Sequence, residues 1–289
     1  MINRQRTILR LVNGEGRHIS KLRLVKLAFL LRQTSRSAPA SATYEFLPYQ
    51  FGPYSFTLNH ELRSLERGGW LRIGDAEIEQ ARSSDSETKR IESTFASEID
   101  ALVRKYRSVS TSSLVRSVYE QYPWFTVHAK DASRRRARLP LAPPAVYTVG
   151  YEGLMLDGLL DLLLRSGIKR LADVRCNPVS RRFGFHKSTL MRHCADVGIS
   201  YVHIPTLGIP SSWRQSLGTD ESYEVLFRRY EREILPSNET WIDAAAQLAA
   251  EVPTAFMCME AESRLCHRSR LAAVIADRTG LSCRELRCP

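Results

Sequence analysis

The N-terminal part of the chain combines two kinds of hydrophobic pattern. Apolar residues recur every three or four positions in three segments, as expected for amphipathic helices. These segments are residues 2–13, 20–32 and 55–67. Aromatic residues alternate over 44–51, which predicts a short strand, and a strand-like wing is predicted over 70–73. Helices followed by a short basic wing are typical of a winged-helix domain, a common scaffold for docking on DNA.

Three short segments of this part resemble a known family. They are residues 21–29, 49–55 and 65–71. Together they are similar to the Panacea antitoxin family, whose members have a helical, winged-helix-like fold. The resemblance implies that this part of the chain binds either DNA or a toxin protein, and it does not choose between the two partners.

Two further predicted helices, over 86–107 and 112–122, complete the first domain. A stretch rich in arginine and then in proline follows them, which is typical of a linker. We therefore divide the chain into three parts. These are a basic winged-helix-like domain over 1–130, a linker over 131–144 and an α/β domain over 145–289.

From residue 145 the pattern changes to short apolar runs that alternate with helical segments. The runs predict buried strands over 146–149, 171–174, 201–204, 255–259 and 283–286. The segments between them predict helices over 156–166, 187–197, 221–234, 240–251 and 268–279. Strands that alternate with helices favour an α/β domain with a mainly parallel sheet, preceded here by the mainly helical N-terminal domain.

The charge of the chain is uneven. The 289 residues carry a formal net charge of +11, and residues 1–144 hold 24 Lys and Arg against 14 Asp and Glu. Residues 145–289 are almost balanced, with 18 against 17. A positive field on one domain attracts a polyanion, and nucleic acid is the commonest one. A basic but inert surface is the alternative interpretation.

Several classes of protein are excluded or disfavoured. No apolar run is long enough to span a membrane, and the first residues lack the apolar stretch of a signal peptide, so we expect a cytoplasmic protein without a membrane partner. The six cysteines are then expected to be free thiols. Seven residues separate Cys258 from Cys266, and His267 follows directly, which is poor spacing for a zinc site. We therefore predict no metal and no other cofactor.

Polar residues follow the predicted strands of the second domain. In parallel sheets, ligands bind outside the carboxyl ends of the strands, so these residues are the candidates for chemistry. Residues two apart on a strand share a face, which pairs Asp173 with Arg175 and Cys258 with Glu260. His267 lies near the start of the helix predicted to follow Cys266, where free N–H groups favour an anion.

The same strand-end residues carry a second resemblance. The segments concerned are residues 148–153, 173–181, 201–208 and 258–268. Their order and spacing resemble the domain of unknown function 488 family over nearly all of 145–287. The resemblance implies an α/β fold and a shared set of polar residues at the edge of the sheet. The family name leaves the activity unassigned, so chemistry must be argued from the site.

Two carboxylates, an arginine and a thiol at one sheet edge suit the cleavage of a base from its sugar. That reaction needs an acidic group near an oxocarbenium-like centre. The candidate catalytic residues are Asp173, Arg175, Cys258, Glu260 and His267. The sequence does not rank Asp173 against Glu260 as the acid. The candidate substrate-binding residues are Tyr151, Glu152, His203, Cys266 and Arg268.

Enzymes that excise bases also need an aromatic platform and contacts to the DNA backbone. Tyr151 is the candidate platform. Loops that mix cations with aromatic rings, and the arginines of the linker, are the candidate DNA contacts. They are Arg134, Arg135, Arg136, Arg181, Arg182, Phe183, Phe185, His186, Trp213 and Arg214. Ordinary core packing is the alternative interpretation for the two phenylalanines.

These features favour a DNA-binding enzyme. The first hypothesis is a glycosylase that excises a modified base, of the 5-hydroxymethylcytosine or 5-hydroxymethyluracil type, from DNA, and the sequence does not choose between duplex and single-stranded substrates. A second hypothesis is redox or sulfur-transfer chemistry at Cys258 and Cys266, because a thiol near a helix start and Arg268 is activated. A third is a regulator without catalytic activity, an antitoxin-like DNA-binding protein with a nucleotide-sensing second domain. Winged-helix domains often dimerise, so a homodimer is left open.

Overall fold

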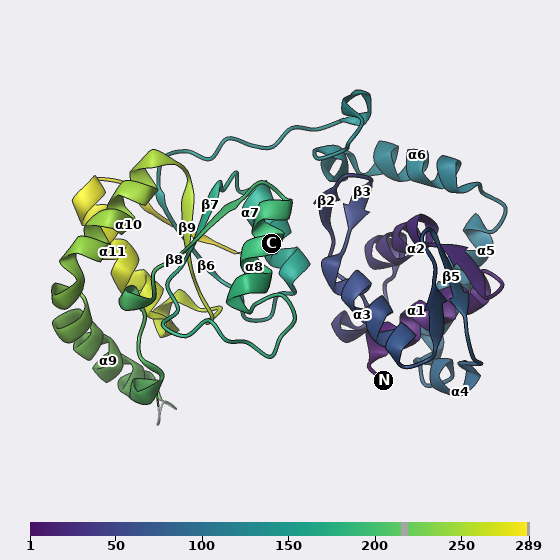
Figure 1. Cartoon of the computed structure of the whole chain (residues 1–289), viewed down its shortest axis with the longest axis horizontal. Helices are drawn as coiled ribbons and strands as arrows, with labels where there is room; N and C mark the ends of the chain where they lie inside the picture. The colour runs from purple at the N-terminus through teal and green to yellow at the C-terminus, as the bar shows by residue number, and fades with distance from the viewer. Residues whose placement is uncertain (215–218, 288–289) are drawn as a thin grey trace. The chain divides into compact units, whose positions relative to one another are not determined.

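A computed structural model describes residues 1–214 and 219–287 (Figure 1). The chain divides into two compact units, Met1–Arg138 and Leu139–Pro289. The division falls inside the stretch that the sequence predicts to be a linker. Among the described residues, no helix has both the length and the apolar character needed to cross a bilayer.

Helices form most of the N-terminal unit. They are α1 Asn3–Gly14, α2 Lys21–Thr34, α3 Phe56–Arg67, α4 Asp85–Thr88, α5 Ser93–Tyr106 and α6 Thr111–Gln121. Nine consecutive residues of α2, from Arg23 to Leu31, are buried, so this helix lies at the centre of the unit. The single helix expected over 86–107 is two helices, because Glu92 ends the connecting turn and accepts hydrogen bonds from the first N–H groups of α5.

The strands of this unit differ in part from the sequence prediction. The wing is a three-stranded antiparallel sheet of β1 His18–Ser20, β5 Glu77–Gln80 and β4 Leu71–Ile73, in that order. The strand expected over 44–51 is instead a hairpin of β2 Leu47–Tyr49 and β3 Gly52–Tyr54. The chain turns at Gln50 and Phe51 because Gly52 adopts a left-handed backbone conformation, with φ of 87°.

The C-terminal unit contains a five-stranded sheet in which every pairing is parallel. The strands are β6 Val146–Gly150, β7 Arg170–Asp173, β8 Ser200–His203, β9 Thr254–Cys258 and β10 Cys283–Leu286. Their order in the sheet is β10-β6-β9-β7-β8. All five residues of β9 are buried, as expected for a central strand covered on both faces. The predicted α/β fold is therefore confirmed.

Helices cover both faces of this sheet, with α7 and α8 on one side and α10 and α11 on the other (Figure 1). The helices of the unit are α7 Leu156–Arg165, α8 Lys187–Asp196, α9 Asp220–Arg229, α10 Glu239–Glu251 and α11 His267–Thr279. The helix expected over 221–234 ends its α-helical part at Arg229 and continues as a π-helical turn, Tyr230–Ile234. This turn directs Tyr230 into the core, where it is fully buried.

Candidate active site at the sheet edge

Two thiols and an imidazole meet where β9 ends and α11 begins. Cys258 is the last residue of β9, and Cys266 is the N-cap of α11, which His267 opens. The sulfur atoms of both cysteines and a ring nitrogen of His267 lie within 4.8 Å of one another. All three side chains are buried. The loop between strand and helix therefore brings together residues that lie eight and nine positions apart.

The ring of His267 is oriented by its surroundings. Its Nε2 atom lies 3.3 Å from the carbonyl oxygen of Val174, which can only accept a hydrogen bond. Nε2 must therefore carry a proton for this bond, and in the neutral ring Nδ1 is left as an acceptor. Nδ1 lies 3.7 Å from Sγ of Cys258, and the ring of Tyr230 packs edge-on against the imidazole. The arrangement is that of a thiol facing a base.

Glu260 connects this thiol to the surface. Its Oε2 atom lies 3.1 Å from Sγ of Cys258, and its Oε1 atom lies 3.1 Å from Nη1 of Arg214. The Glu260 side chain is 16% exposed and that of Arg214 is 30% exposed, whereas Cys258 is fully buried. Of this group, the carboxyl group and the guanidinium are thus the parts that a substrate can reach.

The surroundings shift the pKa values of Cys258 and Glu260 in opposite directions. A hydrogen bond from Cys266 holds the pKa of the Cys258 thiol well below its usual value, and the charges of His267 and Arg214 act in the same direction. Burial raises the pKa of Cys266. Burial, together with the negative charge on Cys258, raises the pKa of Glu260. These shifts favour the charged form of Cys258 and the protonated form of Glu260.

Cys258, Cys266 and His267 are also the residues that could hold a metal. Two sulfurs and one nitrogen are donors that zinc takes, so the fold overcomes the poor sequence spacing. However, the guanidinium of Arg214 also interacts with Sγ of Cys258. A fixed positive charge at a ligand atom disfavours a cation there.

Asp173, the other expected acid, occupies a closed site. Its side chain is fully buried and forms an ion pair with Arg175, with Oδ2 2.6 Å from Nη2. Its carboxylate also accepts hydrogen bonds from Nε and the backbone N–H of Arg175 and from the hydroxyl of Tyr201. A carboxylate with four donors has no free lone pair facing a substrate. The expected role of Asp173 in proton transfer is therefore replaced by a structural one.

Tyr151 does not form the open platform that the sequence predicts. Its ring stacks on Phe185 with centroids 4.2 Å apart, and both rings are buried. Nη1 of Arg175 donates hydrogen bonds to the Tyr151 hydroxyl and to the carbonyl oxygen of Phe185. The alternative interpretation of Phe185 as a core residue is thus correct. Arg175 joins the loop after β6 to the loop between β7 and α8 at the carboxyl end of the sheet.

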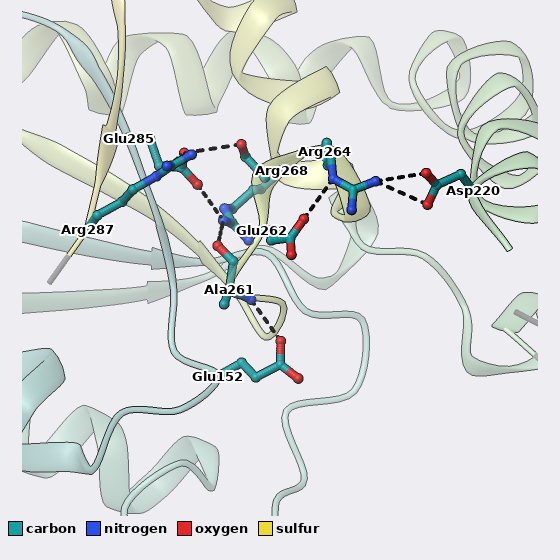
Figure 2. A network of polar contacts seen from close by, with 9 residues as sticks. Glu152, Asp220, Ala261, Glu262, Arg264, Arg268, Glu285 and Arg287 are labelled. Atoms are coloured by element: carbon teal, nitrogen blue, oxygen red, sulfur yellow. Dashed lines mark hydrogen bonds and ion pairs between the residues drawn. The ribbon is translucent and has the colours of Figure 1, made fainter. Parts of the chain in front are cut away.

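Arg268 stabilises the loop that carries Glu260 (Figure 2). Its fully buried guanidinium donates hydrogen bonds to the carbonyl oxygens of Glu260 and Ala261 and forms an ion pair with Glu285. Glu152 acts on the same loop, because its carboxylate accepts a hydrogen bond from the N–H of Ala261. Both side chains therefore position the loop. Arg268 is fully buried, whereas Glu152 remains exposed.

The remaining candidates lie in other parts of the two units. Nε2 of His203 lies 2.9 Å from the carbonyl oxygen of Arg175. The guanidinium of Arg229 packs over the ring of Trp213. Of the candidate residues in the loop before α8, Phe183 is half-buried and Phe185 is buried. The exposed ones are Arg181, Arg182 and His186. The three linker arginines, Arg134 to Arg136, are exposed on the N-terminal unit.

Three residues of these two sites are not among the residues that the sequence predicts to be functional. Tyr201 binds Asp173, and Tyr230 packs on His267 from an element that lies far away along the chain. Gly150, at the end of β6, leaves room for the backbone of Glu260, because a Cβ atom there would overlap the Glu260 carbonyl. A glycine in a predicted strand is a recognised sign of close backbone approach, so this third residue was within reach of sequence reasoning.

Comparison with known families finds one match, in the C-terminal unit. Residues 155–275 match the family described as Domain of unknown function DUF488, which confirms the resemblance expected for the C-terminal half of the chain. The C-terminal unit is thus an α/β domain similar to that family. The Panacea-like resemblance of the N-terminal part stays a prediction. No curated protein and no solved structure matches the chain.

Proposed function

We propose that the protein is a DNA glycosylase that removes a modified base, of the 5-hydroxymethylcytosine or 5-hydroxymethyluracil type, by hydrolysis of the N-glycosidic bond. One observation carries this proposal. Glu260 is a carboxyl group with a raised pKa that remains partly exposed at the carboxyl end of a central strand, beside a cation. A raised pKa favours the protonated carboxylic acid, which is the form that a general acid requires.

The proposed reaction uses Glu260 twice. As the bond between C1′ of the sugar and the base nitrogen breaks, the Glu260 carboxylic acid gives its proton to that nitrogen, and the base leaves in neutral form. A water molecule then bonds to C1′ and gives its proton to the Glu260 carboxylate, which restores the acid. Arg214, which contacts Glu260, is suitably placed to hold a phosphate group of the same nucleotide.

The choice of DNA as substrate rests on charge. Residues 1–144 carry the excess of Lys and Arg over Asp and Glu that accounts for nearly all of the net charge of +11. A polyanion gains most from such a field because its binding releases condensed counterions. The proposal therefore joins a basic N-terminal unit that holds DNA to a C-terminal unit that acts on one nucleotide.

Base release from duplex oligonucleotides tests this proposal. The full chain is incubated with duplexes that contain 5-hydroxymethylcytosine, 5-hydroxymethyluracil or no modified base, and the free base and the alkali-labile abasic site are measured. We expect release from a modified duplex by the wild type and by Glu262→Gln, an exposed neighbour in the same loop, but not by Glu260→Gln. Binding without release by the wild type would contradict the proposal.

A second candidate, thiol-dependent redox or sulfur-transfer chemistry, is favoured by the contact between Cys258 and His267. The two candidates differ in the residue that they need. Hydrolysis by Glu260 survives Cys258→Ser with a reduced rate, whereas thiol chemistry does not. Alkylation with iodoacetamide, followed by mass spectrometry, measures the reactivity of Cys258 against that of Cys194, a buried thiol whose pKa burial raises to about 12. Equal, slow labelling of both would exclude the second candidate.

A further inference from the structure

The β2–β3 hairpin of the N-terminal unit exposes an aromatic ring at its tip. Phe51 is one of the two turn residues and is 57% exposed. Hollows of about 300 and 380 Å³ adjoin this ring on two sides. A third hollow of about 560 Å³ shares Leu22 with the first of them and Tyr119 with the second. The three hollows therefore adjoin one another in one surface, and Phe51 lines two of them.

The tip that carries Phe51 is held rigidly from below. Nζ of the buried Lys26 donates hydrogen bonds to the carbonyl oxygens of Phe51 and Pro53, at 2.6 and 2.9 Å. Gly52 packs so closely on the ring of Tyr119 that a Cβ atom would approach it to 2.5 Å. Burying an amine costs free energy unless the amine is hydrogen-bonded. Here the buried amine of Lys26 stabilises the turn, while the side chain of Phe51 remains in solvent. A fixed, exposed ring is a suitable binding element, because little conformational freedom is lost when it binds.

Cations outnumber acids around the ring. The cations that line the three hollows, apart from Lys26, are Lys21, Arg116, Lys130, Arg134 and Arg136. The acids that line them are Glu120 and Asp131, and Asp131 forms an ion pair with Arg134 at 3.1 Å. Positive charge around an exposed ring matches a strand of nucleic acid, whose phosphates meet the cations while a base stacks on the ring.

We propose that this surface, centred on Phe51, binds a DNA strand with unpaired bases, and that Phe51 stacks on one base while Arg116, Lys130 and Arg136 contact phosphates. The inference rests on the proposed function, since it names the surface through which the N-terminal unit holds the substrate strand. A protein surface is the alternative occupant. The charge excess favours DNA, because a neutral protein partner would leave several cations unpaired.

Fluorescence anisotropy with a labelled single-stranded oligonucleotide tests the surface. The full-length wild type is compared with Phe51→Ala, Arg136→Gln and Arg104→Gln, the last being a control that removes an exposed charge from α5, outside the three hollows. We expect Phe51→Ala to weaken binding about tenfold or more. We expect Arg136→Gln to weaken binding and to lower the slope of log affinity against log salt by about one. Arg104→Gln should bind as the wild type does.

The outcomes separate this inference from the proposed function. Equal binding by Phe51→Ala, Arg136→Gln and the wild type would overturn the surface, even if the wild type still releases a base from duplex DNA. A wild type that binds no oligonucleotide would overturn it as well. Binding that depends on Phe51 and Arg136, without release of any base, would support the surface and contradict the glycosylase. Thermal melting of each variant shows that its fold is retained.

Discussion

The ends of β7 and β9 each carry an acidic residue beside an arginine, yet the two are built for different tasks. At β7, Asp173 has four hydrogen-bond donors and no exposure to solvent. At β9, Glu260 has one cation, one thiol and a partly exposed side chain. A buried carboxylate whose lone pairs all accept hydrogen bonds stabilises the fold. A partly exposed carboxyl group with a raised pKa can instead exchange its proton. Residue type alone does not distinguish the two.

The largest effect on stability is expected for Asp173→Asn. The change leaves the buried guanidinium of Arg175 without its anion, which costs about 3 to 5 kcal/mol. Urea unfolding of the C-terminal unit measures it. The control is Glu262→Gln, which breaks an exposed ion pair with Arg264 and should cost no more than about 1 kcal/mol. Equal losses of stability in the two variants would contradict the structural role of Asp173.

Tyr201→Phe is expected to have the next largest effect. It removes the 2.7 Å hydrogen bond to Oδ2 of Asp173 and leaves the ring in place, so we expect a loss of about 2 kcal/mol. The same unfolding measurement applies. A double variant with Asp173→Asn should lose less than the sum of the two single losses, because both act on one network. Strict additivity would show that the hydroxyl and the carboxylate do not interact.

Gly150→Ala tests how the fold positions Glu260. The added methyl group would overlap the Glu260 carbonyl, so the loop after β9 must move. We expect a loss of about 1 to 3 kcal/mol in stability and a fall in base release larger than this loss explains. Gly153→Ala makes a useful comparison, because no atom lies within 4 Å of a Cβ there, although its positive φ adds some strain. Equal activity in the two variants would contradict the positioning role.

The smallest effect on stability is expected for Glu260→Gln, and this effect changes with pH. The folded pKa of Glu260 is raised above the usual value of 4.5, so between that value and the folded pKa the unfolded chain binds fewer protons than the folded one. Stability therefore falls as the pH rises through this window, and the variant lacks this fall. Unfolding midpoints of both proteins from pH 4 to pH 8 measure it. Parallel curves would show that Glu260 titrates normally.

The sequence predicts the sheet well because burial on both faces leaves a simple signal. The run 255–259 is continuously apolar and 146–149 is apolar except for Thr148, and the structure places strands at both. The hairpin at 47–54 was missed because its turn depends on Gly52 and on a buried lysine from α2. A carbonyl hydrogen bond of that kind leaves no pattern in the sequence.

The sequence also selects the right neighbourhood for the site without assigning the roles within it. Cys258, Glu260 and His267 are brought together as expected from strand ends that share one edge. The roles of Asp173 and Tyr151 could not be foreseen, because they depend on Tyr201 and Phe185, which reach them from other elements. Burial of a polar side chain is decided by such distant partners.

The central claim is that Glu260 performs the chemistry and that Asp173 does not. Single-turnover base release from a duplex with 5-hydroxymethylcytosine or 5-hydroxymethyluracil, measured from pH 5 to pH 9, tests it most directly. We predict a wild-type rate that falls as the pH rises past the raised pKa of Glu260, and no release by Glu260→Gln at any pH. Release by Glu260→Gln at the wild-type rate, with the same pH dependence, would contradict the claim.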